Sequence, residues 1–314
     1  MKRDIIDWFG RIHIGRWNDR HVWGKAVEKV AIKWLHDTPR IENATENVMA
    51  WQKAGLLLGV GTDKAKCVCE NLKEELRHVK NDRVNPEHLL LAYALKDDPE
   101  NVNAFVETYK NSTIPYRKHE NAIRYVDTIG MVVPYLHWIG MDVLAKRQME
   151  EYDKAMWKNV FPAHAYNMDL DLPMGVFDWC RGCGWYILAL VESVDMDGLK
   201  ERVLNLASAL LPLQKGNGGF GAFFFNKDTR QESSGTALIG LLMLTAYDFT
   251  NEDKYLTCAK NCERALMEAT RRDGRVDFCQ GDTACIGDYS HVFSLMPFAQ
   301  GMALKLYKML NKYD

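Results

Sequence analysis

The chain has 314 residues, 47% of them hydrophobic, and its 40 basic and 42 acidic residues leave a formal net charge of −2. This length and apolar content allow either one large domain with a sizeable core or two smaller ones. The charges are mixed along the chain without a basic block or stripe, so the sequence indicates neither a nucleic-acid partner nor a membrane surface.

The sequence pattern does not indicate export. Asp4 and Asp7 interrupt any apolar run behind the basic start, and no stretch approaches the ~20 apolar residues that span a bilayer. Eight cysteines in a chain of this length do not form the dense framework of a small disulfide-stabilised domain. The sequence therefore predicts a cytoplasmic protein.

In chain order, the pattern is helical almost throughout. Residues 1–20 are rich in charge and Trp, and we expect them to pack as an N-terminal arm. An amphipathic helix is expected over residues 21–36, and similar charged helices centre on Leu72, Val106, Met149, Leu206 and Ala265. Six segments rich in apolar and small residues alternate with them, around Leu57, Leu90, Val132, Leu188, Leu241 and Met302.

This alternation predicts the fold class. A helix that is apolar on every side is buried, whereas an amphipathic helix covers others. Six buried helices ringed by about six covering ones describe an all-α (α/α)6 toroid, and we expect residues 1–314 to form a single domain. An open α-solenoid is the competing layout, but its repeats usually resemble one another in sequence. Strand signals are weak, so we expect at most one short β-hairpin, within residues 216–230.

Asp127 stands one turn into an apolar helix, in the run YVDTIGMVVPYL. Burying an unpaired carboxylate costs several kcal/mol or forces it to protonate, so Asp127 is either a paired structural charge or a functional one. The N-terminal ends of the inner helices meet at one end of a toroid, and polar residues precede or begin several of them: Asp82, Asp127, Arg181, Glu232 and Asp288. Each alone suits helix capping, but together they predict a polar site.

Several motifs in fixed order give the chain a family resemblance. Asp127 in YVDTIGMVVPYL, His164 in FPAHAY and Arg181 in WCRGCGWY follow one another, with DRVNPE from Asp82 upstream and ESSGTA from Glu232 downstream. This order resembles the unsaturated glucuronyl and rhamnogalacturonyl hydrolases of glycoside hydrolase families 105 and 88, from about residue 51 to residue 304.

The sequence departs from the family pattern in three places. Cys180 and Cys183 replace the Gly and Asn usual around the Arg-Gly pair, and Asn167 replaces an acid. None of these changes removes a catalytic group that the resemblance implies, but we expect them to retune the substrate pocket.

The resemblance implies an activity and two catalytic carboxylates. The substrate would be a lyase-generated oligosaccharide of the rhamnogalacturonan type, from whose non-reducing end a 4,5-unsaturated uronic acid is removed by hydration of its vinyl ether. Asp127 would be the acid/base, a role worth roughly 10²- to 10⁴-fold in rate, and Asp82 the second carboxylate. Neither a cofactor nor a metal is implied.

The resemblance also implies a set of substrate-binding residues. Arg181 offers a planar fork for the uronate carboxylate, and Arg117 is the second choice. The remaining expected contacts are aromatic or polar: His164, Tyr166, Trp179, Trp185 and Glu232. For these side chains the alternatives are structural, namely an ion pair for the arginine, a satisfied core histidine and ordinary packing of the tryptophans.

Two other functions stay open. Another toroid sugar enzyme, such as an N-acyl-hexosamine epimerase, would need a pair of histidines facing the sugar ring, and the histidines here are not so spaced. A non-catalytic carbohydrate-binding relative would not need both Asp82 and Asp127. Cys180 and Cys183 have the spacing of a zinc half-site, but no second pair lies at zinc spacing, so no metal is expected. The sequence decides neither the leaving sugar nor the oligomeric state.

Overall fold

The computed structural model describes residues 17–37 and 50–314, which form twelve α-helices, seven short strands and five 3₁₀ turns. The 3₁₀ turns are η1 (Thr62–Ala65), η2 (Asn81–Arg83), η3 (Asp153–Ala155), η4 (Leu211–Leu213) and η5 (Asn311–Tyr313). The expected N-terminal arm lies almost entirely outside the described residues.

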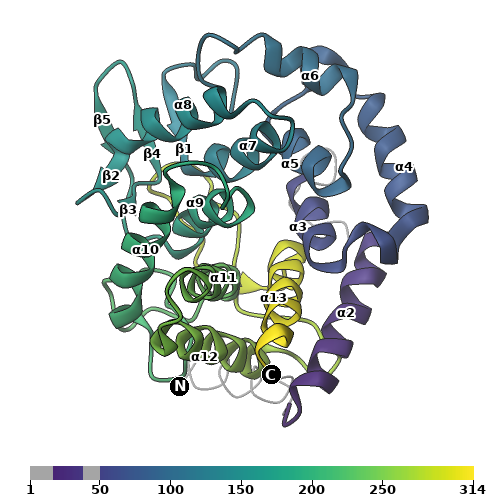
Figure 1. Ribbon diagram of the computed structural model, residues 1–314, viewed down its shortest axis with the longest axis vertical. Coiled ribbons are helices and arrows are strands. Elements are labelled where there is room, and N and C mark those ends of the chain that lie inside the picture. The colour runs from purple at the N-terminus through teal and green to yellow at the C-terminus, as the bar shows by residue number, and fades with distance from the viewer. Residues whose placement is uncertain (1–16, 38–49) are drawn as a thin grey trace.

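Six helices form a closed inner ring (Figure 1). Each packs against the next in chain order, and the last packs back on the first. They are almost wholly buried because they are apolar on nearly every side. These helices are α3 (Ala50–Val60), α5 (Pro86–Leu95), α7 (Val126–Trp138), α9 (Cys180–Glu192), α11 (Ser233–Thr250) and α13 (Pro297–Leu310).

The other six helices lie outside this ring (Figure 1). Each buries one face and exposes a charged one, as in α4, where Val68, Leu72 and Leu76 point inward. The outer helices are α2 (Arg20–Asp37), α4 (Lys66–Arg77), α6 (Glu100–Glu107), α8 (Asp142–Tyr152), α10 (Leu199–Leu210) and α12 (Asp253–Ala269). The predicted (α/α)6 toroid is therefore confirmed. None of the helices in the described residues has the length and apolar character needed to cross a bilayer.

The ring closes where α3 meets α13, and glycines make that closure possible. A Cβ on Gly59 would lie 2.2 Å from the carbonyl oxygen of Gly301, and a Cβ on Gly301 would lie 2.0 Å from that of Gly55. No side chain fits at such distances, so the two backbones touch directly.

Three aromatic side chains fill the centre of the ring. Trp51 of α3, Trp185 of α9 and Phe298 of α13 lie with ring centroids 5.4 Å (Trp51–Trp185), 5.3 Å (Trp51–Phe298) and 4.6 Å (Trp185–Phe298) apart. We call these three residues the aromatic plug. Because they come from different inner helices, they block the hole of the toroid.

The strands form three small antiparallel sheets, so the expectation of at most one hairpin was wrong on this point. Within residues 216–231 the structure has only isolated bridges, such as that between Gly221 and Gln231. The strands are two or three residues long, and β1 and β4 pair across about 40 residues of sequence. A local alternation of apolar and polar residues therefore does not indicate them. The sheets are β1 (Ile123–Tyr125), β4 (Ala165–Asn167) and β5 (Leu172–Met174); β2 (Met156–Trp157) and β3 (Phe161–Pro162); β6 (Cys279–Gln280) and β7 (Phe293–Ser294).

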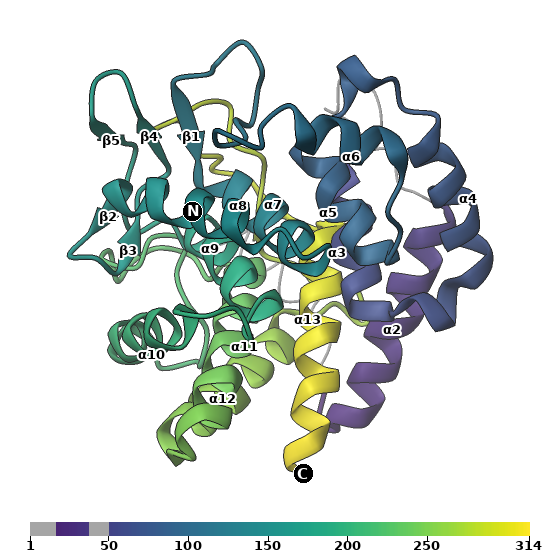
Figure 2. The same ribbon diagram turned by 45° about the horizontal axis from the view of Figure 1, so that its top comes forward.

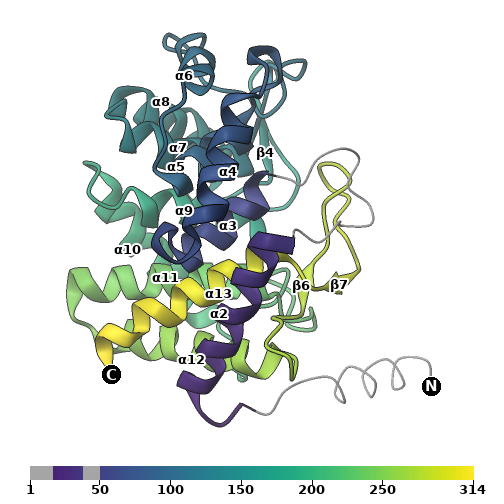
Figure 3. The same ribbon diagram turned by 90° about the vertical axis from the view of Figure 1, so that its right-hand side faces the viewer.

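Two of these sheets mark one end of the toroid. β1, β4 and β5 lie side by side at the edge of the ring, and β1 leads directly into α7 (Figure 2). β6 and β7 lie at the end from which α13 starts, as the side view shows (Figure 3). The loops and helix starts at this end surround the pocket described next.

Candidate active site

A pocket with a cavity volume of about 1030 Å³ opens at this end of the ring. Its wall includes the first turns of α3, α5, α7 and α9 and the loop over residues 282–286. Ligand sites commonly measure about 300–1,000 Å³, so the pocket has room for more than one sugar ring. Trp51 and Trp185 of the aromatic plug form part of its lining and close it from below.

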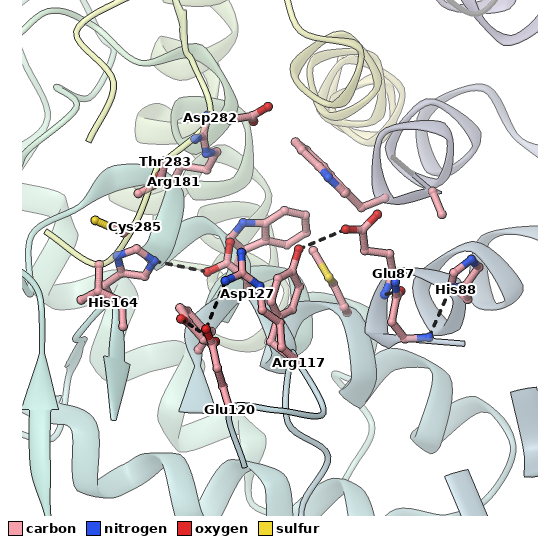
Figure 4. Close-up of a pocket in the computed structure, with 18 of the residues that line it drawn as sticks. Glu87, His88, Arg117, Glu120, Asp127, His164, Arg181, Asp282, Thr283 and Cys285 are labelled. Atoms are coloured by element: carbon pink, nitrogen blue, oxygen red, sulfur yellow. Dashed lines mark hydrogen bonds and ion pairs between the residues drawn. The ribbon is translucent and has the colours of Figure 1, made fainter. Parts of the chain in front are cut away.

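Asp127 and His164 meet in this pocket because β1 pairs with β4. Tyr125 lies opposite Ala165 in the ladder, and the N–H of Val126 donates to the carbonyl of His164 at 3.0 Å. The side chains that flank this pairing then face each other, with Nε2 of His164 3.9 Å from Oδ2 of Asp127 (Figure 4).

The surroundings of Asp127 favour its protonated form. Burial raises the pKa of Asp127 to about 6, and the nearby Asp282 adds to the rise, while Arg181 and Trp185 oppose it. Its Oδ2 is buried and has no hydrogen-bond partner in the described residues. An acid of this pKa can donate a proton near neutral pH and then act as a base.

His164 is a neutral histidine under most conditions. Burial lowers its pKa to about 4, and the positive charge of Arg181 acts in the same direction. Its Nδ1 lies 3.2 Å from the hydroxyl of Tyr289, and its ring packs on Trp179 with centroids 4.6 Å apart. The imidazole is therefore held in place beside Asp127 without a competing charge.

Arg181 joins the first turn of α9 to the loop that forms one lip of the pocket. Its Nη2 donates to the carbonyl of Gly281 at 2.7 Å and its Nη1 to the carbonyl of Gln280, while its guanidinium lies 5.4 Å from the Trp179 ring centroid. A guanidinium has five N–H donors, so these two bonds leave others for a ligand. Arg181 both orders this loop and supplies a fixed positive charge to the pocket.

A second carboxylate in the pocket comes from Glu87, which ends the DRVNPE motif but was not predicted as a site residue. The hydroxyl of Tyr116 donates to it at 3.0 Å, and the amides of Ala50 and Trp51 at the start of α3 also face it. Burial raises the pKa of Glu87, although these donors favour its ionised form. The N-terminus of α3 explains why a half-buried acid is tolerated there.

Four residues that the sequence placed at the site do not line the pocket: Asp82, Tyr166, Glu232 and Asp288, of which Asp288 is exposed. Asp82 is exposed in η2, and its backbone carbonyl accepts a hydrogen bond from Lys118 at 2.9 Å. Tyr166 points its hydroxyl at Asp171. Glu232 is fully buried as the N-cap of α11, where it accepts bonds from the amides of Ser234 and Gly235. Its position looked functional because a capping acid and a site acid share the same place at a helix start.

The structure brings the other predicted residues together. Asp127, His164, Trp179, Arg181 and Trp185 line the pocket, as does Arg117, which is half-exposed and pairs with Glu120 at 3.2 Å. Residues that sequence reasoning missed also line it: Trp51, Tyr116, Glu120, Tyr125 and Asp282. The sequence does contain a signal for Asp282 as a site residue, because Asp282 lies in the Gly-containing loop before the last inner helix.

Cys180 and Cys183 belong to the packing of α9 and not to the pocket. Both thiols are free and buried, and burial raises their pKa above the usual range of a cysteine. Such thiols are inert apolar side chains.

The fold and the pocket together define a class of protein. An (α/α)6 toroid here carries, at one end, a pocket that combines aromatic faces, acids and arginines. Aromatic rings can pack on the apolar faces of sugars, and carboxyl groups can move protons at a glycosidic centre. The class is that of toroid proteins with a carbohydrate-type site.

The comparisons with known proteins identify the family that the chain resembles. The family model described as Glycosyl Hydrolase Family 88 matches residues 176–311, which confirms the resemblance seen in the motifs. No curated protein sequence gives a significant match.

Solved structures share the fold along nearly the whole chain. A possible family 105 member from Salmonella enterica is 17% identical with a TM-score of 0.77, over 95% of this chain and 96% of that one. An unsaturated glucuronyl hydrolase from Bacillus sp. GL1, responsible for degradation of glycosaminoglycan, is 15% identical with a TM-score of 0.69, over 92% and 96%. A family 105 glycoside hydrolase from C. acetobutylicum is 14% identical with a TM-score of 0.69, over 90% and 99%. At these identities the likeness is one of fold.

Proposed function

We propose that this protein is a glycoside hydrolase that removes a 4,5-unsaturated uronic acid from the non-reducing end of oligosaccharides. The observation that carries the proposal is Asp127, a pocket acid whose pKa is raised to about 6, beside a neutral His164. The match to Glycosyl Hydrolase Family 88 over residues 176–311 supports the same reaction class.

The proposed reaction is hydration of the vinyl ether. Protonated Asp127 gives its proton to C4 of the unsaturated ring, and positive charge develops at C5. The resulting carboxylate takes a proton from the water that adds at C5. The C5 hemiketal then opens to a ketone, and the hemiacetal left at the anomeric carbon expels the neighbouring sugar. Asp127 ends protonated, as it began, so no cofactor is needed.

The neighbours of Asp127 have supporting roles in this proposal. Asp127 itself turns from acid to base within one cycle, which a pKa near 6 permits. Arg181 and Arg117 would attract the carboxylate of the uronate, and Trp179 would pack on its ring. Glu87 and Asp282 would stabilise the positive charge in this proposal, because both line the pocket and Asp82 does not.

The finer proposal is that the oligosaccharide is of the rhamnogalacturonan type. It rests on the motif order shared with the rhamnogalacturonyl hydrolases. Related folds act on other uronides, since one solved structure that the chain resembles is an unsaturated glucuronyl hydrolase specific for heparin. A panel of unsaturated disaccharides linked to rhamnose, galacturonate or hexosamine tests this proposal directly, and fastest turnover of a linkage other than rhamnose would contradict it.

The first test is Asp127→Asn, followed by loss of the ultraviolet absorption of the conjugated double bond. We expect a folded variant whose rate falls by at least about 10²-fold, the lower end of what a general acid supplies. Normal turnover by this variant would overturn the mechanism.

Two further variants identify the second carboxylate. Glu87→Gln is expected to reduce kcat/KM more than Asp82→Asn does, because only Glu87 lines the pocket. The opposite order would return the role to Asp82.

A further inference from the structure

We propose that exposed cations at the pocket mouth bind a second anionic group of the substrate, a carboxylate or sulfate on the leaving sugar or the sugar after it. We call His78, Lys80 and Arg83 the cationic rim. This inference rests on the proposed function and adds a preference for one substrate class to it.

The cationic rim lies in a short segment between α4 and α5. All three residues line the pocket and all three are exposed, whereas Trp51 and Trp185 of the pocket floor are buried. The segment is held in shape by η2, where the N–H of Arg83 donates to the carbonyl of Lys80 at 2.8 Å. The rim is therefore an ordered part of the mouth.

Lys80 and Arg83 carry charges that residues 17–37 and 50–314 leave without a partner. In the described part of the chain, neither side chain has an ion pair or a hydrogen bond. The other exposed cations nearby have protein partners: Arg117, which the proposed function assigns to the uronate carboxylate, pairs with Glu120 at 3.2 Å, and Lys118 donates to the carbonyl of Asp82 at 2.9 Å. The ring Nδ1 of His78 lies 2.8 Å from the carbonyl oxygen of Glu74. Lys80 and Arg83 are thus the two rim residues free to bind an anion.

The charge of the pocket and its mouth is mixed. Asp282, on the loop over residues 282–286, lies across the pocket from Glu87 and His88, which follow the cationic rim in sequence (Figure 4). Arg181 lies beside Asp282 and Glu87 lies opposite, so charges of both signs line each side of the pocket. Lys80 and Arg83 add exposed positive charge at the mouth, which attracts an acidic oligosaccharide.

The geometry of the pocket assigns the rim to the reducing-end side of the scissile bond. The aromatic plug closes the floor, so the terminal uronate enters first and reaches Asp127. The sugars that follow can only leave through the mouth. In the proposed function the uronate carboxylate lies near the buried Arg181, so Lys80 and Arg83 meet the next charge along the substrate.

The experiment compares substrates with and without that second charge. Neutral rhamnose, acidic galacturonate or a sulfated hexosamine is the leaving sugar in three unsaturated disaccharides, and a rhamnogalacturonan tetrasaccharide places the carboxylate one sugar further out. Wild-type protein and the double variant Lys80→Gln/Arg83→Gln are assayed for kcat/KM on each. Lys25→Gln/Lys29→Gln, two exposed residues of α2, is the control with the same change in net charge.

We expect wild-type kcat/KM to be about 5- to 10-fold higher for the rhamnogalacturonan tetrasaccharide, which keeps the rhamnose linkage, than for the rhamnose disaccharide. This range follows from two exposed ion pairs. The preference should disappear in Lys80→Gln/Arg83→Gln and stay in the control, and raising the salt from 0.05 to 0.5 M should weaken it, because salt screens exposed charges. A gain of the galacturonate or sulfated hexosamine disaccharide would keep the role of the rim, identify carboxylate or sulfate as the bound group, and overturn the rhamnogalacturonan proposal.

Two outcomes would overturn the inference, and they can be told apart. Equal kcat/KM on all four substrates, or a preference that survives in Lys80→Gln/Arg83→Gln, removes the role of the rim and leaves the proposed function intact. Consumption of none of the substrates by the wild-type protein removes both. Circular dichroism and thermal melts show whether each variant is folded, and loss of folding from these exposed substitutions would contradict the free state assigned to Lys80 and Arg83.

Discussion

At the scale of single residues, Asp127 stands where the fold opposes its ionisation. Its pKa is about 6 in the folded protein and 3.8 for an unperturbed aspartate. Between these pH values the folded chain binds more protons at this site than the unfolded chain, so the free energy of unfolding falls as pH rises through the window. A pKa difference of two units corresponds to about 3 kcal/mol. Above pH 6, ionised Asp127 therefore lowers the free energy of unfolding by about this amount.

This penalty predicts that Asp127→Asn stabilises the protein at high pH. At pH 8 we expect a gain of about 1–3 kcal/mol in the free energy of unfolding, because the buried charge is gone. At pH 4 the wild-type side chain is already protonated, so the gain should nearly vanish. Urea denaturation at both pH values measures the difference.

A surface substitution separates this effect from general changes. Asp228→Asn, on an exposed loop, should have the same small effect at both pH values. An equal gain for Asp127→Asn at pH 4 and pH 8 would show that ionisation of Asp127 carries no such penalty.

The candidate site could be predicted only in part from sequence, and individual residues show why. Asp127 and Arg181 stand in the first turns of inner helices, where the toroid itself brings them together. Glu232 stands in an equivalent place, but its side chain caps its own helix. The sequence does not indicate whether an acid at a helix start caps the helix or faces the pocket. Glu87 was missed because its partners, Tyr116 and the start of α3, come from distant segments.

At the scale of elements, the twelve helices followed from composition because burial and amphipathicity repeat over long stretches. The small sheets did not, since two- and three-residue strands contain too little pattern and their pairing is non-local. The β1–β4 pairing nevertheless decides the site, because it brings His164 to Asp127.

The contact between α3 and α13 gives a prediction for Gly301. Gly301→Ala places a methyl group 2.0 Å from the carbonyl oxygen of Gly55, so the two inner helices must separate. We expect a loss of at least about 1–3 kcal/mol in the free energy of unfolding, even though Ala favours a helix over Gly.

Gly216→Ala is the matched control for Gly301→Ala, because nothing lies within 4 Å of the added Cβ at position 216. Its stability should change by less than about 1 kcal/mol. If urea denaturation shows equal effects for the two variants, the close helix contact does not limit stability.

At the scale of the whole molecule, ring closure and the location of the pocket are linked. α13 completes the ring against α3, and the same two helices provide Phe298 and Trp51 to the aromatic plug. We propose that residues 1–314 act as a single domain, because the pocket takes side chains from both ends of the ring sequence. The plug leaves the pocket open at one end of the toroid.

A pocket of this shape predicts exclusively terminal action. We expect that the end of a saccharide chain reaches Asp127, because the aromatic plug prevents a chain from passing through the ring. Lyase-generated oligosaccharides of increasing length should therefore each lose one unsaturated uronyl unit and nothing else, which mass spectrometry measures alongside the loss of ultraviolet absorption. Oligosaccharides with a saturated end are the control and should remain intact. Fragments cut from within the chain would mean that the substrate lies across the mouth of the pocket instead of entering it.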